Sequence, residues 1–132
     1  MDLRSDYPYW LLKDGIIRTY PSLKKNIKTD IVVLGAGITG ALVSYKLVEA
    51  GKEVVVVDRR HVGMGSTAAS TALLQYEIDV PLHELIHKVG EKNAIRSYCL
   101  CIDAIKELEK ITEGINGDAE FLRKPSRSFL LI

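Results

Sequence analysis

The chain has 132 residues, 47% of them hydrophobic, and its 18 basic and 17 acidic residues give a formal net charge of +1. That apolar content excludes a disordered chain and suffices for one modest domain with its own core. The balanced charge lacks the excess typical of proteins that bind nucleic acid or an anionic surface, so we expect neither partner.

The first 29 residues carry aromatics, two prolines and a basic patch without clear periodicity. They predict an irregular N-terminal arm whose aromatic side chains pack on a partner surface, followed by one domain over 30–132. Residues 31–34 are a short apolar run rich in β-branched side chains, and they predict a buried parallel strand. Apolar residues at helical spacing then predict a helix over 38–50, closed by Gly51.

A second buried strand is expected at 54–57, so strand, helix and strand form a βαβ unit. A loop with a helix start follows over 59–72. Gly90 closes a short predicted helix that begins at Leu82, and a long helix covers 91–113. The tail, 120–132, predicts one or two strands. We therefore expect an α/β fold: a Rossmann-like domain with a parallel sheet and flanking helices. We expect this domain to be truncated, because the chain stops within an apolar pattern.

Residues 35–40 read G-x-G-x-x-G between the first predicted strand and the predicted helix, which is the context of a dinucleotide-binding site. Gly35 permits the tight turn, Gly37 lets a pyrophosphate approach the backbone, and Gly40 lets the helix pack closely on the sheet. The helix N-terminus presents free N–H groups and its positive dipole end to the phosphates. A glycine-rich turn without a ligand is the alternative that this context disfavours.

Asp58 ends the second predicted strand, where an acid accepts hydrogen bonds from the ribose hydroxyls of the adenosine. An acid there disfavours a 2′-phosphate, so NADP is the least expected ligand. The fingerprint itself fits both FAD and NAD. The NAD-binding domain of a dehydrogenase is therefore the alternative interpretation.

Beyond the fingerprint, the sequence resembles the D-amino-acid oxidase-like family of FAD-dependent oxidoreductases. The resemblance is carried by 30–40, Leu47, Gly51, 55–58 and the loop Gly63-Met64-Gly65-Ser66-Thr67. Residues 71–75 also look like the family's small-small-Leu-x-Gln segment, and Tyr9-Trp10-Leu11 loosely resembles the bacterial amine-oxidising members. Residues 65–70, Gly-Ser-Thr-Ala-Ala-Ser, depart from the family's usual Gly-x-x-Ser-x-x-Asn-Gly-Gly, which leaves the subfamily and substrate open.

The resemblance implies that FAD is the cofactor and that the chain is the N-terminal FAD-binding part of an oxidoreductase acting on an amine or amino acid. By the same resemblance, Asp58 and Arg59 hold the adenosine end, Ser66 and Thr67 meet the pyrophosphate, and Ala72 and Leu73 lie near the ribityl chain and the isoalloxazine edge. The expected cofactor-binding residues are Gly35, Ala36, Gly37, Ile38, Thr39, Gly40, Asp58, Arg59, Arg60, Gly65, Ser66, Thr67, Ala72 and Leu73.

Family members run to several hundred residues, with a β-rich substrate domain and a second FAD-contacting segment that this chain lacks. We therefore expect the catalytic residues to lie elsewhere and the chain alone to be inactive. Open sheet edges favour its self-association. The sequence leaves the substrate, the electron acceptor and the retention of FAD by this chain undecided.

His83-Glu84-Leu85-Ile86-His87 matches H-E-x-x-H, the pattern in which two histidines on one helix face bind zinc and the glutamate acts as general base. A third ligand could come from Glu107, Glu109 or Glu113. The simpler interpretation is a surface helix with its apolar residues toward the core. A zinc metallopeptidase is therefore a remote alternative, and no metal is expected.

Cys99 and Cys101 form no disulfide framework, because two cysteines at i, i+2 on a helix diverge. Buried thiols and a reducing compartment are the simplest interpretation. The N-terminus has no apolar signal region, and apolar runs such as 54–57 are far too short to cross a bilayer. We therefore expect a cytoplasmic protein without a membrane span.

Overall fold

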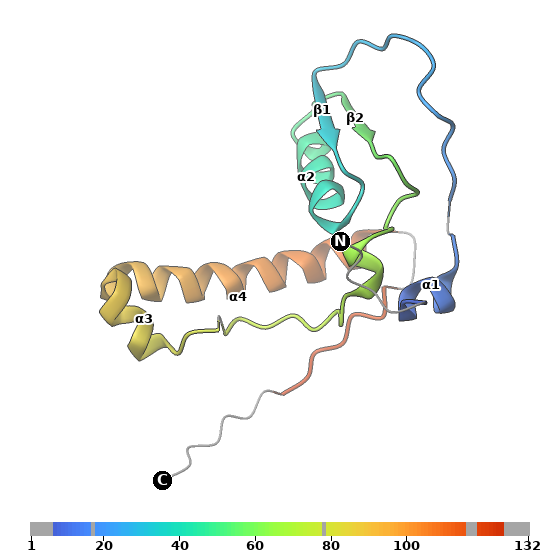
Figure 1. The fold of residues 1–132 in the computed structure, drawn as a ribbon. Coiled ribbons are helices and arrows are strands. Elements are labelled where there is room, and N and C mark those ends of the chain that lie inside the picture. The colour runs from blue at the N-terminus through green and yellow to red at the C-terminus, as the bar shows by residue number, and fades with distance from the viewer. Residues whose placement is uncertain (1–6, 17, 78, 116–118, 126–132) are drawn as a thin grey trace. The chain divides into compact units, whose positions relative to one another are not determined.

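The computed structural model of the chain describes residues 7–16, 18–77, 79–115 and 119–125. The chain divides into two compact units, Met1–Ala72 and Leu73–Ile132. Both strands of the described residues belong to the first unit, and the second unit is helical (Figure 1).

The N-terminal arm contains a helix, α1 (Tyr9–Asp14), where the sequence predicts irregular structure. Pro8 occupies its N-cap, and Gly15 follows its last residue with a φ of 65°. This is the order in which proline and glycine bracket a short helix. The Trp10 Nε1–H group donates a hydrogen bond of 2.8 Å to the carbonyl oxygen of Ser70. Trp10 therefore packs on a loop of its own chain.

The predicted βαβ unit is confirmed. Strands β1 (Ile31–Leu34) and β2 (Val54–Val57) pair in parallel with Ile31 opposite Val54. Helix α2 (Ile38–Glu49) connects them, and Gly51 follows it with a φ of 74°, as expected for a glycine just beyond a helix end. The result is a small α/β unit with a two-stranded parallel sheet.

Helix α2 covers one face of this sheet (Figure 1). A Cβ placed on Gly40 of α2 would lie 3.5 Å from Val33 Cγ1, so the helix packs on the Val33 face. Side chains alternate along a strand, so Val32 and Leu34 lie on the opposite face. They are 54% and 83% exposed. The prediction of a fully buried strand is therefore wrong for this face, because no element of the first unit's described residues covers it.

The second unit is built on a helical hairpin. Helices α3 (Leu82–Val89) and α4 (Glu91–Gly114) meet at Gly90, whose φ is 81°, and they pack against each other. The Tyr98 hydroxyl donates a hydrogen bond of 2.9 Å to the Val80 carbonyl oxygen and so ties α4 to the chain before α3. Both helices match the sequence prediction, although α4 includes Gly114, which the sequence places just after the helix.

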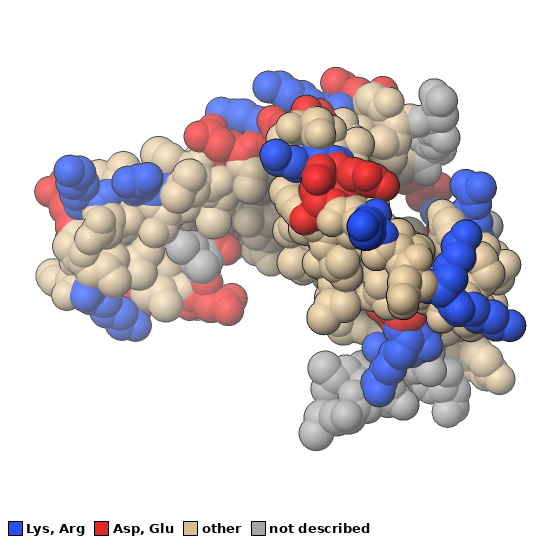
Figure 2. Space-filling view, turned by 90° about the horizontal axis from the view of Figure 1, so that it is seen from above, with Lys and Arg blue, Asp and Glu red and all other residues tan. Residues whose placement is uncertain are grey.

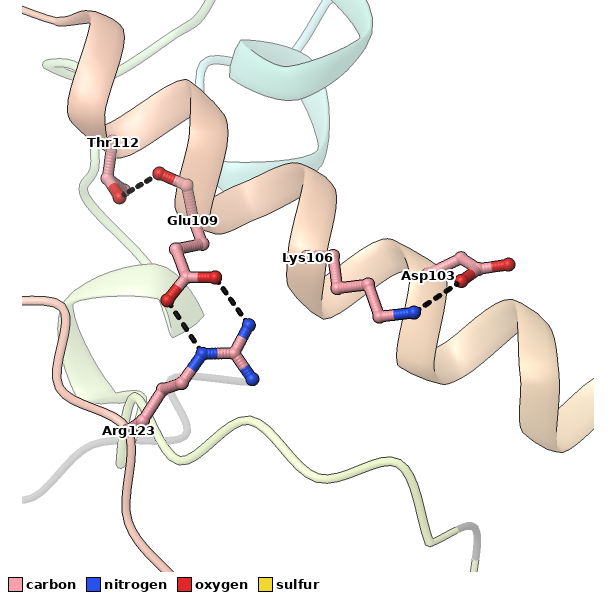
Figure 3. Close-up of polar contacts among 5 residues, drawn as sticks. All are labelled: Asp103, Lys106, Glu109, Thr112 and Arg123. Carbon is pink, nitrogen blue, oxygen red and sulfur yellow. Dashed lines mark hydrogen bonds and ion pairs between the residues drawn. The ribbon is translucent and has the colours of Figure 1, made fainter.

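The tail forms no strand over 119–125, so the predicted strand is wrong there. The remaining predicted strand residues, 126–132, lie outside the described part of the chain. The guanidinium of Arg123 donates from Nε and Nη2 to the two carboxylate oxygens of Glu109, as Figure 3 shows. This hydrogen-bonded ion pair lowers the pKa of Glu109 and raises that of Arg123. It fastens the tail segment to the last third of α4.

Charged residues of both signs are interspersed with uncharged surface on the face seen in Figure 2, in keeping with the net charge of +1. Close pairs such as Lys106 with Asp103, 3.2 Å apart, illustrate the pattern (Figure 3). Among the described residues, no helix combines the length and the apolar character needed to cross a bilayer.

Candidate functional site

The fingerprint residues form the turn from β1 into α2. Gly35 has a φ of 109°, which side-chain-bearing residues rarely adopt, and its N–H donates a hydrogen bond of 2.8 Å to the Val57 carbonyl oxygen. At Gly40, a Cβ would lie 1.9 Å from the Gly35 carbonyl oxygen. Glycine is therefore required at 35 by the backbone angle and at 40 by the closeness of the helix to the turn.

A hydroxyl group stands at the N-terminus of α2. Gly37 is the N-cap of α2, and Thr67 belongs to the short 3₁₀ turn η1 (Ser66–Ala69) that follows β2. The Thr67 Oγ1 accepts a hydrogen bond of 3.1 Å from the N–H of Ile38. A Cβ on Gly37 would lie 3.0 Å from this oxygen. The start of the helix therefore already accommodates an oxygen atom, as a site for an anion requires.

The Asp58 carboxylate joins the end of β2 to the turn after β1. One of its oxygens accepts a hydrogen bond of 2.7 Å from the Ala36 N–H, and the other accepts one of 2.8 Å from the Arg60 N–H. These bonds, first that of Ala36 and then that of Arg60, hold the pKa of Asp58 below its ordinary value, and the positive charges of Arg60 and Arg59 lower it further. The carboxylate is therefore ionised at neutral pH.

The loop from Asp58 to η1 carries a cation. Gly65 has a φ of 98°, and a Cβ there would lie 2.7 Å from Nη2 of Arg60. The guanidinium thus lies against the start of η1. The loop is tied back to the fingerprint by the Gly63 N–H, which donates a hydrogen bond of 2.9 Å to the Ala36 carbonyl oxygen.

After η1, the chain turns through Ser70 to Ala72. The Ser70 N–H donates to the Thr67 carbonyl oxygen at 3.2 Å, and the Ala72 N–H donates to Ser70 Oγ at 3.1 Å. Ala72 has a φ of 55°, which is uncommon for a residue other than glycine. Leu73 is the first residue of the second unit and is 67% exposed. The first unit therefore brings together the fingerprint, Asp58, Arg60 and η1, whereas Leu73 is not placed with them.

The other predicted cofactor residues lie around the same turn. Arg59 and Ser66 are exposed beside Asp58 and Thr67, and Thr39 is exposed in the first turn of α2. The sequence did not assign Trp10 and Ser70 to the site. The hydrogen bond between them lies at the end of η1. No sequence pattern pairs positions so far apart, although Pro8 and Gly15 do signal the helix that carries Trp10.

The H-E-x-x-H segment lies on α3, with His83 and His87 both exposed. Within the ranges that the structure describes, no group of three or more His, Cys, Asp and Glu side chains could hold a metal ion. Glu109, one of the suggested third ligands, is paired with Arg123. Nothing in this part of the chain therefore supports the zinc alternative.

Comparison with known proteins gives a family match over most of the chain. A model of a family described as FAD dependent oxidoreductase matches residues 30–128. The "Putative Rieske 2Fe-2S iron-sulfur protein YhfW" of Bacillus subtilis is 28% identical over 116 residues, which is 88% of this chain and 23% of that protein. The "Probable oxidoreductase OrdL" of Haemophilus influenzae is 28% identical over 94 residues, which is 71% of this chain and 22% of that protein.

A shorter similarity links the chain to a thiamine thiazole synthase of Aeropyrum pernix, 40% identical over 42 residues, which is 32% of this chain and 16% of that protein. No solved structure matches. The chain thus spans less than a quarter of the length of each of these relatives.

Proposed function

Because the chain belongs to the family of FAD-dependent oxidoreductases, we propose that its first unit binds the ADP part of FAD, the cofactor of this family. The observation that carries the proposal is the meeting of three features at one sheet edge. They are the glycine turn, the start of α2 with the Thr67 hydroxyl, and the ionised Asp58. In this proposal, β1, α2 and β2 are the first βαβ repeat of a Rossmann-like domain.

The pyrophosphate is assigned to the N-terminus of α2. The helix dipole and the backbone N–H groups of its first turn favour an anion there. Gly37 leaves the backbone open to approach, and the hydroxyls of Ser66 and Thr67 are suitable phosphate partners. The Arg60 guanidinium, packed against Gly65, supplies a nearby positive charge.

The adenosine ribose is assigned to Asp58. Each carboxylate oxygen accepts one backbone hydrogen bond, and a carboxylate oxygen can accept a second one from a ribose hydroxyl. Arg59, exposed beside it, is assigned to the same end of the cofactor. An ionised acid in this place favours the unphosphorylated ribose of FAD over the 2′-phosphate of NADP.

In the whole protein, we assign residues 1–29 to an arm and 30–132 to part of the FAD-binding domain, with Ala72 and Leu73 directed toward the flavin. Bound FAD supplies the redox chemistry by accepting a hydride from substrate. An amine or amino acid is the proposed substrate class, from the resemblance to D-amino-acid oxidase-like enzymes. The relative named as a probable oxidoreductase supports the reaction class. The cytoplasmic location stays a prediction.

The test is a titration of the chain with FAD, followed by the change in flavin fluorescence. We expect saturable binding that ADP competes away, and NAD to compete more weakly. Asp58→Ala removes the ribose acceptor and also the acceptor of the Ala36 and Arg60 N–H groups, so it should weaken FAD binding by at least about tenfold. Lys106→Ala, on α4 in the second unit, is the matched control and should bind as the unchanged chain does.

Two outcomes contradict the proposal. If the unchanged chain gives no saturable signal, the first unit does not hold FAD. If NAD binds more tightly than FAD, the dehydrogenase alternative replaces the proposed cofactor.

A further inference from the structure

A chain of hydrogen bonds connects the N-terminal arm to the start of α2. The indole N–H of Trp10 donates to the Ser70 carbonyl oxygen at 2.8 Å. The N–H of Ser70 in turn donates to the Thr67 carbonyl oxygen, and the Thr67 hydroxyl accepts the N–H of Ile38. Four residues from three distant segments are thereby joined in one continuous series.

The indole ring of Trp10 is itself held in place. The Tyr9 ring lies 5.0 Å from it between centroids, in an edge-to-face arrangement at 81°. The Lys13 ammonium lies 5.4 Å from the ring centroid, a favourable cation–π distance. Helix α1 also packs on η1 as a whole. The donor of the first hydrogen bond is therefore fixed by its own helix.

The segment that accepts this bond has few stabilising contacts from its own side chains. The 3₁₀ turn η1 is four residues of small side chains, Ser66–Ala69, and it follows Gly65, whose φ of 98° is accessible mainly to glycine. Small side chains bury little apolar surface, so the conformation of such a turn depends on its hydrogen bonds. The contact with Trp10 restrains the residue at its C-terminal end.

We propose that Trp10 is a positioning residue for the pyrophosphate site. Acting through Ser70, it holds η1 so that the Thr67 hydroxyl faces the N-terminus of α2. This proposal rests on the proposed function, in that the ligand placed there is the pyrophosphate of FAD. It makes the arm part of the cofactor site, although no residue of the arm is assigned a contact with the cofactor.

The variant that tests this is Trp10→Phe, which keeps an aromatic ring beside Tyr9 and removes the donor. Tyr9→Phe, one position earlier on the same helix, is the matched control because it keeps both rings and the indole N–H. In the chain without cofactor, we expect Trp10→Phe to speed amide hydrogen exchange over residues 66–70 and at Ile38, and Tyr9→Phe to leave it unchanged.

The second readout separates positioning from a general loss of structure. Trp10→Phe should weaken the binding of FAD and of ADP by about five- to tenfold, the change expected for one hydrogen bond. Adenosine lacks the pyrophosphate and is held by Asp58, so its affinity should be unchanged. An equal loss for adenosine and ADP would show a merely structural role and overturn the proposal.

Unchanged exchange over 66–70 in Trp10→Phe also overturns it, whatever the affinity for FAD. If the chain without substitutions binds no FAD, the proposed function fails and the positioning role fails with it. If the unchanged chain binds FAD and Trp10→Phe binds it equally well, only the positioning role fails.

Discussion

Each unit is stabilised internally by a different kind of contact. In the first unit, single hydrogen bonds join residues that are distant in sequence: those of Asp58 with Ala36, Thr67 with Ile38 and Trp10 with Ser70 span 22, 29 and 60 residues. In the second, two helices adjacent in sequence pack along their lengths, and the Arg123–Glu109 pair spans 14 residues. The first unit should therefore be sensitive to small changes at particular atoms, and the second should tolerate them.

The largest expected difference between the units is at glycine. Gly40→Ala places a Cβ 1.9 Å from the Gly35 carbonyl oxygen, so the turn or the helix must move. We expect it to destabilise the first unit by about 3 kcal/mol, the upper end of the usual cost of overpacking, because the contact is with backbone. Fluorescence of Trp10, the single tryptophan of the chain, reports on that unit during urea unfolding.

Gly114→Ala is the matched change in the second unit. It lies at the end of α4, where, apart from its chain neighbours and the nearby backbone of its own helix, no described atom is within 4 Å of the added Cβ. It should stabilise α4 by up to about 1 kcal/mol or leave it unchanged, because alanine favours the helix. Equal losses in the two variants would remove the contrast between the units.

At high salt, the stability that Asp58 gives the first unit should stay sensitive to acid, whereas that which Glu109 gives the second should not. The pKa of Asp58 and of Glu109 is lowered on folding, so each stabilises its unit above its ordinary pKa, near 4, and loses that contribution as the pH falls through the lowered value. For Asp58 the main cause is a backbone N–H, whereas for Glu109 it is an exposed arginine, whose side chain is 61% accessible. Salt screens the interaction of Glu109 with Arg123 much more than the hydrogen bond from the Ala36 N–H to Asp58.

We therefore expect 1 M salt to remove the acid sensitivity that Glu109 contributes and to leave most of that of Asp58. The pKa values, measured by NMR titration of the two carboxylates at low and high salt, decide this. A shift toward the ordinary value for both groups alike would contradict the expectation. Asp58→Asn should remove the acid sensitivity that Asp58 contributes to the first unit, and Glu109→Gln the part that Glu109 contributes to the second.

The smallest effect is expected at Ala72, where the units meet in the sequence. Its φ of 55° strains alanine, and glycine adopts this angle freely but loses more entropy on folding. The two effects oppose each other, so Ala72→Gly should change the free energy of unfolding by less than about 1 kcal/mol. A large loss of stability in urea unfolding would mean that the alanine methyl group makes a packing contact important to the first unit.

Local sequence patterns predict most of the elements. The strands at 31–34 and 54–57, the helices around them and the helical hairpin are all expected, because apolar periodicity and glycine act over a few residues. Helix α1 is not predicted by periodicity, because six residues give too little of it, and only Pro8 and Gly15 signal it. The apolar composition of the tail predicts a strand, but over 119–125 the tail pairs through Arg123 with a helix.

The candidate site is predictable in part. The fingerprint and Asp58 stand at fixed distances along a βαβ unit, so their spacing in the sequence is enough to place them at one edge of the sheet. The bond of Trp10 to Ser70 depends on where the arm folds back, which no local pattern determines. The exposure of Val32 and Leu34 is unpredictable for the same reason: the strand pattern requires a cover on both faces but does not say which residues provide it.

In dinucleotide-binding folds, the acid at the end of the second strand favours an unphosphorylated ribose, so its replacement is the direct way to admit a 2′-phosphate. In this chain the same carboxylate accepts the N–H groups of Ala36 and Arg60. A neutral or basic replacement would leave both donors without this acceptor and loosen the turn that carries the fingerprint. A change of cofactor here would thus require a compensating acceptor for the Ala36 N–H, introduced together with the substitution.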